Sequence, residues 1–184
     1  MKKEVRGHLK FMPQPVLMIG TYDENGIPNL MNAAWGGQYD YDMIFIALAE
    51  HKTTDNIRLK KEFTVAFATK DTLTASDYFG IESGKKVNKI EKAGFHARKS
   101  EKIDAPVFDE YPVTLECRLV EENDYGIIAD VIGTVADESV LNEEGQIDLD
   151  KAGLISFDPT SNSYRVIGEK AGAAFSAGLA IKNK

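Results

Sequence analysis

The chain has 184 residues, of which 43% are hydrophobic and 28% charged, and its 22 basic and 29 acidic residues give a formal net charge of −7. This length and composition indicate one globular domain with a real core and exclude a disordered chain. The acidic balance argues against a nucleic-acid-binding protein, and the longest apolar run, residues 43–49, is far too short to span a membrane.

The chain opens with two expected strands joined by a tight turn. Residues 16–22 are rich in strand-forming side chains and stop at Asn25-Gly26, a pair that favours a hairpin turn because both residues tolerate positive φ. A second strand is expected over residues 28–34. Gly36-Gly37 then interrupts the chain before a third strand over residues 43–48, whose continuous apolar run predicts burial on both faces.

Short helices and further strands follow. The pattern predicts a helix over residues 53–61 with Thr53 or Asp55 as its cap, and a helix over residues 87–93 ended by Gly94. The other expected elements are strands at residues 63–68, 113–121 and 127–136, a helix at 73–79, a loop at 96–110, a turn at 142–145, short extended pieces at 154–157 and 164–167, and a weakly helical tail at 169–181. Many short strands without a βαβ rhythm predict a mainly β fold with short helices, built as an antiparallel barrel and as a single domain over residues 1–184.

Several kinds of site are absent from the sequence. Residues 80–86 only approximate a P-loop, and no Gly-x-Gly-x-x-Gly dinucleotide fingerprint occurs. His8, His51 and His96 are far apart and have no second ligand three or four residues away, so no metal site is expected. Cys117, the single cysteine, lies in an expected strand and is predicted to be an inert core thiol. The N-terminal residues do not resemble a signal peptide, which favours a cytoplasmic protein.

Three segments suit a flat, anionic ligand. Residues 29–37 combine small side chains with glycines, which let a ligand approach the backbone. Residues 51–56 open a helix, and residues 83–89 form a basic loop, so both segments suit a phosphate. Each segment also has a purely structural interpretation, with Trp35 as a core or interface aromatic, the hydroxyls as helix caps, Asn56 as a solvent-facing helical residue and the lysines as a solvated surface.

Five stretches, taken in order, match the pattern of a known family. They are residues 15–21 (PVLMIGT), 28–35 (PNLMNAAW), 62–66 (EFTVA), 83–90 (SGKKVNKI) and 164–169 (YRVIGE). With them the chain resembles the flavin reductase-like, FMN-binding split-barrel family, and particularly its flavoredoxin branch, over about residues 10–180. The resemblance implies a Greek-key split β-barrel that forms a homodimer, with FMN bound noncovalently near the subunit interface.

The same resemblance implies which residues bind the cofactor. The family often has Arg near residues 51–52, so whether His51 or Lys52 meets the phosphate is left open. The implied FMN-binding residues are Asn32, Ala33, Ala34 and Trp35 along the isoalloxazine ring, Lys52, Thr53 and Asn56 at the phosphate and ribityl chain, and Ser83, Gly84 and Lys86 where the pocket closes.

The implied activity is that of an NAD(P)H:FMN oxidoreductase, in which a hydride passes from NADH or NADPH to flavin N5. Because the flavin supplies the reactivity, no acid–base pair is needed and no catalytic side chain is expected. Two alternatives stay open. One is a flavoredoxin-like FMN electron carrier that a redox protein partner reduces, for which the acidic surface would suit a basic partner. The other is a barrel without a cofactor that serves as a binding module.

Overall fold

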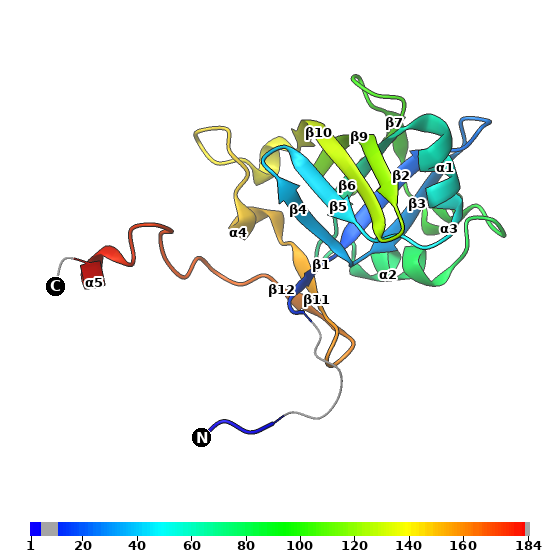
Figure 1. The fold of residues 1–184 in the computed structure, drawn as a ribbon. Helices are drawn as coiled ribbons and strands as arrows, with labels where there is room; N and C mark the ends of the chain where they lie inside the picture. Colours follow the sequence, from blue (N-terminus) through cyan, green and yellow to red (C-terminus); the bar gives the residue numbers. More distant parts are fainter. Residues whose placement is uncertain (5–10, 183–184) are drawn as a thin grey trace.

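A computed structural model of the chain describes residues 1–4 and 11–182 (Figure 1). Its main layer is a curled, wholly antiparallel sheet of seven strands. In spatial order these strands are β3 (Pro28–Ala33), β2 (Leu17–Tyr22), β6 (Glu62–Phe67), β9 (Val113–Asn123), β10 (Gly126–Ala136), β5 (Met43–Ile46) and β4 (Gly36–Asp40). Neighbours such as β2 and β6, or β5 and β10, are far apart in the sequence, so long connections and not a simple meander build the sheet.

The first hairpin folds as its turn sequence predicts. β2 and β3 pair along their full length. Between them the Asp23 carboxylate accepts hydrogen bonds from the backbone N–H groups of Asn25 at 3.0 Å and Ile27 at 2.9 Å. Gly26 has a φ of 75°, a conformation that a side chain would strain. The turn therefore fixes the start of β3 and, because the strand has six residues, also the position of its last residues, Asn32 and Ala33.

Alternating side chains of β2 divide the apolar core between the two faces of the sheet. Leu17 and Ile19 belong to the cluster on one face, whereas Met18 and the preceding Val16 belong to the cluster on the other face, together with residues of α2 and α3. Cys117 lies in the first cluster with no exposed surface. Burial raises the pKa of its thiol, which agrees with the predicted inert core cysteine.

Short helices and two small sheets complete the fold. The helices are α1 (Lys52–Lys60), α2 (Leu73–Ile81), α3 (Lys89–Ala93), α4 (Leu149–Ala152) and α5 (Leu179–Lys182), with one 3₁₀ turn at Glu138–Val140. The small sheets are β1 (Gln14–Pro15) with β11 (Ile155–Asp158) and β12 (Ser163–Val166), and β7 (Ala97–Lys99) with β8 (Pro106–Phe108). Gly94 ends α3 at a φ of 68°, as predicted. Within the described residues, none of the helices has the length and apolar character needed to cross a membrane.

Two local expectations about the first half of the chain are wrong. Gly36 and Gly37 do not interrupt the chain but begin β4, and a Cβ on Gly36 would lie only 2.8 Å from the Phe45 carbonyl oxygen of the paired strand. β5 is not buried on both faces, because Ile44 is buried while Met43 and Phe45 are half-buried. These glycines serve close strand pairing, which the sequence alone does not distinguish from a turn.

Other expectations fail because tertiary partners decide the outcome. The expected loop at residues 96–110 contains β7 and β8, two three-residue strands that pair only with each other. The expected helical tail at residues 169–181 has no regular structure up to residue 173 and turns at residues 174–178, and only its end belongs to α5; its side chains are exposed, so no packing stabilises a longer helix. The N-cap of α1 is His51, without a side-chain capping bond, and not Thr53 or Asp55.

Candidate functional site

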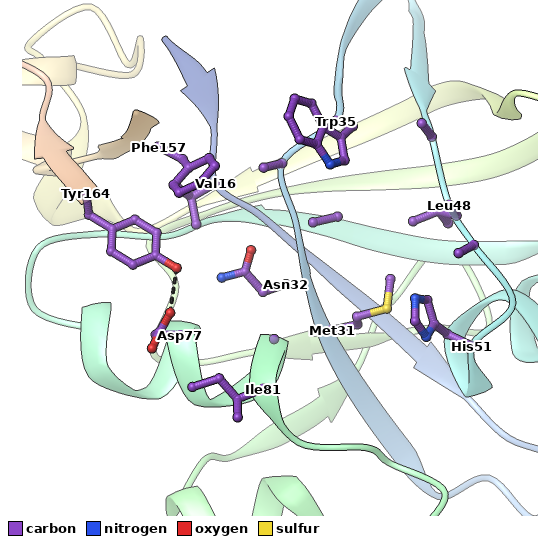
Figure 2. A pocket seen from close by; sticks show the side chains of 15 residues that line it. Val16, Met31, Asn32, Trp35, Leu48, His51, Asp77, Ile81, Phe157 and Tyr164 are labelled. Carbon is purple, nitrogen blue, oxygen red and sulfur yellow. Dashed lines mark hydrogen bonds between the residues drawn. The ribbon is translucent and has the colours of Figure 1, made fainter. Parts of the chain in front are cut away.

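A cavity of about 490 Å³ opens where β3 ends (Figure 2). Its walls come from the end of β3 and the link to β4, the segment before α1, the helix α2, and the small sheet of β11 and β12. Apolar groups and backbone form most of the lining, and the polar side chains are Asn32, His51, Asp77 and Tyr164, with the indole of Trp35. A cavity of this kind suits a flat ligand that needs a few well-placed polar contacts.

Asn32 ties the end of β3 to α2. Its side-chain amide donates a hydrogen bond to the Ser76 carbonyl at 2.9 Å. Gly80, one turn further along α2, stands against the same residue, and a Cβ there would lie 3.3 Å from the Asn32 Cβ. A glycine at this position therefore lets α2 approach β3 closely, and it leaves room in the cavity, which Gly80 also lines.

A second polar pair lies at one end of the cavity. The Tyr164 hydroxyl donates to Asp77 Oδ1 at 2.7 Å, which joins β12 to α2 (Figure 2). The Tyr164 ring stands beside that of Phe157, with centroids 5.9 Å apart and planes at 52°. Burial, and then the hydrogen bond to Asp77, raise the pKa of Tyr164 to about 12, so it stays a hydrogen-bond donor at neutral pH.

At its other end the cavity continues into two further hollows. One of about 230 Å³ shares Met31, Asn32 and His51 with the cavity, and the next, of about 250 Å³, shares Lys52 and Gly84 with the first hollow. We call these two hollows together the basic groove. The lysines that line it are Lys52, Lys85, Lys86 and Lys89.

Gly84 lets the loop after α2 lie against β3. A Cβ at this position would stand 2.2 Å from the side-chain oxygen of Asn29 and 3.5 Å from Cδ of Lys52. Any larger residue must displace Asn29, whose amide donates to the Thr53 hydroxyl at 2.9 Å. The glycine thus keeps β3, α1 and this loop together around the groove.

Lys89 is the most unusual group in the basic groove. Its side chain comes from the first turn of α3 and is only 4% exposed, and its ammonium group donates to the Phe79 carbonyl at 2.8 Å. Burial disfavours the charged form and lowers the pKa of Lys89 to about 8. Glu50 and Glu82 also line the first hollow, so the groove is mixed in charge, and it is at Lys89 that a bound anion would offset the cost of burial.

The structure brings the two predicted groups of residues onto one continuous surface. Asn32, Ala33, Ala34 and Trp35 all line the cavity. Lys52, Thr53, Ser83 and Gly84 line the first hollow of the basic groove, and Lys86 lines the second. A ligand with a flat ring at one end and a phosphate at the other would therefore meet both groups at once.

The two residues at the start of α1 that were expected at the phosphate already have partners. Lys52 forms an ion pair with Asp23 at 2.9 Å, and the hydroxyl of Thr53, a residue only 1% exposed, accepts a hydrogen bond from Asn29. His51 is exposed and lines both the cavity and the first hollow. His51 thus lies at the junction between the cavity and the basic groove, and Lys52 lies within the groove.

Asn56 does not lie on this surface. Its side chain is buried and its amide donates to the Thr21 hydroxyl at 2.9 Å, which fastens α1 to β2. It is therefore neither a solvent-facing residue nor a lining residue of the groove. Asn56 lies one helical turn after Lys52, but its side chain points into the fold. Its role therefore depends on tertiary packing, which the local sequence pattern does not reveal.

Neither Asp77 nor Tyr164 was among the predicted site residues, and the alternative interpretation of the lysines of residues 83–89 as a solvated surface does not hold for Lys89, which is buried. Tyr164 lies in a stretch that matches the family, but nothing in its spacing points to Asp77, which lies 87 residues away. Across residues 1–4 and 11–182, no three His, Cys, Asp or Glu side chains gather closely enough to hold a metal ion, and His8 lies outside these residues.

Residues 9–151 match the family model described as flavin reductase like domain. This chain belongs to that family. The match includes the end of β3, the start of α1 and the loop after α2, which line the basic groove and much of the cavity, whereas the cavity wall from β11 and β12 lies beyond it. The predicted resemblance to flavin reductase-like proteins is confirmed.

Solved structures place the chain within this family more closely. A flavoredoxin of Desulfovibrio vulgaris (Miyazaki F) is 31% identical, with 97% of this chain and 100% of that chain covered and a TM-score of 0.93. A flavoredoxin from Methanosarcina acetivorans is 28% identical, with 98% and 99% covered and a TM-score of 0.86. An FMN-binding domain of a flavin reductase-like enzyme from Shewanella baltica is 26% identical, with 87% and 89% covered and a TM-score of 0.76. The mainly β split-barrel fold and the flavoredoxin branch are thereby confirmed.

Proposed function

We propose that this flavin reductase-like protein is an FMN-dependent oxidoreductase that accepts a hydride from NADH or NADPH. The observation that supports this proposal is the continuity of the cavity with the basic groove, because one surface then offers a ring site and a phosphate site. The FMN-binding domain from Shewanella baltica, with the same fold, supports FMN as the ligand.

The residues present fit FMN. The cavity is mainly apolar, as a stacked ring requires, and Asn32 and Asp77 offer polar groups at its edge. The groove offers Ser83, the close-packed Gly84 and a buried ammonium group on Lys89. A phosphate next to Lys89 gains a charge-assisted hydrogen bond and also relieves the cost of burying an unpaired cation.

Bound FMN would supply the redox chemistry itself, by taking a hydride at N5. The chain's own residues hold and shield it. The backbone and small side chains of Ala33 and Ala34 let the ring lie flat, and Trp35 borders the open side of the cavity. Ser83, Lys52 and Lys89 bind the phosphate end, and no side chain needs to act as an acid or base in the transfer.

The test is the reaction of the FMN-loaded protein with each donor in the absence of oxygen. We expect that, near neutral pH, adding NADH or NADPH abolishes the visible absorbance of the oxidised flavin. The rate of this loss should saturate as the donor concentration rises. If neither nicotinamide reduces the bound flavin, the proposed activity is wrong.

A flavoredoxin-like electron carrier is the second candidate, and the likeness to two flavoredoxins over nearly the whole chain favours it. In that case a redox protein, and not a nicotinamide, would reduce the flavin. The net charge of −7 would suit docking to a basic partner. Rapid reduction by a reduced ferredoxin-type protein, with no reduction by NADH or NADPH, would establish this candidate in place of the first. If the protein did not bind FMN at all, the remaining candidate would be a barrel without a cofactor that serves as a binding module.

We also propose that the protein is a homodimer. An apolar hollow of about 150 Å³, lined by Leu17, Val65 and Leu115 among others, opens on the sheet, and Phe175 in the C-terminal tail is fully exposed. A second copy would cover both surfaces. Light scattering of the eluted protein tests this, and a mass of about 20.3 kDa would contradict it. The cytoplasmic location stays a prediction.

A further inference from the structure

Asp77 places a negative charge in the cavity without a basic partner beside it. The carboxylate lines the cavity from α2, and its Oδ1 accepts the hydroxyl hydrogen of Tyr164 at 2.7 Å. Within the described residues Asp77 forms no ion pair, and no lysine or arginine lines the cavity. His51 is the other titratable lining group besides Asp77 and Tyr164.

The position of this charge relative to the basic groove matters. Asp77 and Tyr164 line the cavity but not the groove, whereas His51 lines both. Figure 2 shows Tyr164 and Asp77 across the cavity from His51, with Asn32 between them. A ligand whose phosphate lies near Lys89 would therefore turn the far edge of its ring toward the Asp77 carboxylate.

We propose that Asp77, held in place by Tyr164, sets the charge balance of the bound ring and lowers its reduction potential. The inference rests on the proposed function, because it requires FMN in the cavity. A hydride brings two electrons and one proton, so the nicotinamide donor is oxidised while the flavin gains one negative charge unless it takes up a second proton. The Asp77 carboxylate, which lines the same cavity, would oppose that added charge.

Tyr164 acts here as a positioning residue. Its hydroxyl donates to one carboxylate oxygen of Asp77 and so holds the carboxylate against β12. The side-chain amide of Asn32 is held by the Ser76 carbonyl in the same corner. The oxidised flavin ring is uncharged and would not be repelled at this edge, whereas the reduced, anionic ring would meet the like charge of Asp77.

The test compares the midpoint potential of bound FMN in the wild-type protein and in Asp77→Asn. The variant should favour reduced over oxidised FMN about tenfold more than the wild type does, a rise of about 30 mV for a two-electron couple. Asp71→Asn is the matched control, since Asp71 is exposed just before α2 and does not line the cavity. Tyr164→Phe retains the charge of Asp77 but releases its carboxylate, so it should raise the potential by less than Asp77→Asn does. Equal potentials in the wild type and Asp77→Asn, or an equal rise in Asp71→Asn, would overturn the proposal.

The same samples separate this inference from the proposed function. Titration with FMN first shows whether the wild type binds it, and a protein that does not bind FMN refutes both. If Asp77→Asn does not fold or does not bind FMN, the midpoint potential of FMN bound to the wild type is compared with that of free FMN. The proposal predicts a lower potential for the bound FMN. A higher potential for bound than for free FMN would refute the role of Asp77 and leave FMN binding intact.

Discussion

If the FMN phosphate binds beside the buried ammonium group of Lys89, as proposed, the affinity for FMN should depend on pH. The pKa of Lys89 is lowered to about 8 by burial, so the group is about nine-tenths charged at pH 7 and about one-tenth charged at pH 9. At the higher pH, binding of a phosphate to the charged form requires Lys89 to take up a proton from solution. The dissociation constant for FMN should therefore rise about tenfold from pH 7 to pH 9, or about 1.4 kcal/mol.

Riboflavin provides the control, because it has the same ring and no phosphate. Fluorescence titrations of both ligands at pH 7, 8 and 9 measure the effect, and the ratio of the two dissociation constants removes changes at the ring end. Lys89→Met should weaken FMN at pH 7 and abolish the pH dependence of the ratio. A ratio that stays constant over this range in the wild type would refute the assignment of Lys89 to the phosphate end.

Lys89 should also affect the stability of the protein without ligand. Here a rise in pH is favourable, whereas it weakens the binding of FMN. Because folding lowers the pKa of Lys89 from 10.5 to about 8, the folded protein binds fewer protons than the unfolded chain between these values. The contribution of Lys89 to the free energy of unfolding should therefore increase as the pH rises from about 8 to about 10.5. Urea unfolding of the wild type and of Lys89→Met, compared across this range, should show the difference, and parallel curves would contradict it.

Three further predictions concern the groove and its supports. Replacing Lys52 and Thr53 together by alanine should weaken FMN more than riboflavin, whereas equal losses would show that the phosphate end lies elsewhere. Asn56→Ala should lower the free energy of unfolding by about 1–3 kcal/mol in urea titrations, since a buried hydroxyl of β2 loses its partner, and a change in the FMN to riboflavin ratio would contradict this purely structural role. Gly84→Ala should weaken FMN because its Cβ would lie 2.2 Å from a side-chain oxygen of β3, while Gly172→Ala, with nothing within 4 Å, should not.

The parts of the fold that the sequence predicts are those with local causes. The β2–β3 hairpin follows from Asn25-Gly26, and the end of α3 follows from Gly94, because both turns need a positive φ at a glycine. β4 and the β7–β8 pair were missed because their strands exist only through their partners. Gly36 looks like a break in the sequence and becomes part of a strand only where Phe45 passes close to it.

The residues of the candidate site also fall into those that the sequence predicts and those that depend on tertiary contacts. Residues 32–35 and 83–84 are contiguous stretches, so a family resemblance was enough to single them out, and the structure joins them into one surface. Asp77 faces Tyr164 only because the small sheet packs against α2, and no pattern of spacing predicts such a contact. The burial of Lys89 depends likewise on where α3 sits, and a helical pattern of a few residues does not determine that.

The most direct test of FMN binding is the visible absorption spectrum of the protein after mixing with excess FMN and separation on a desalting column. We predict that oxidised flavin absorbance travels with the protein in stoichiometric amount at pH 7, and that riboflavin is retained less well because it lacks the phosphate. A colourless protein fraction, with all FMN eluting later, would contradict the proposed cofactor and with it the proposed function.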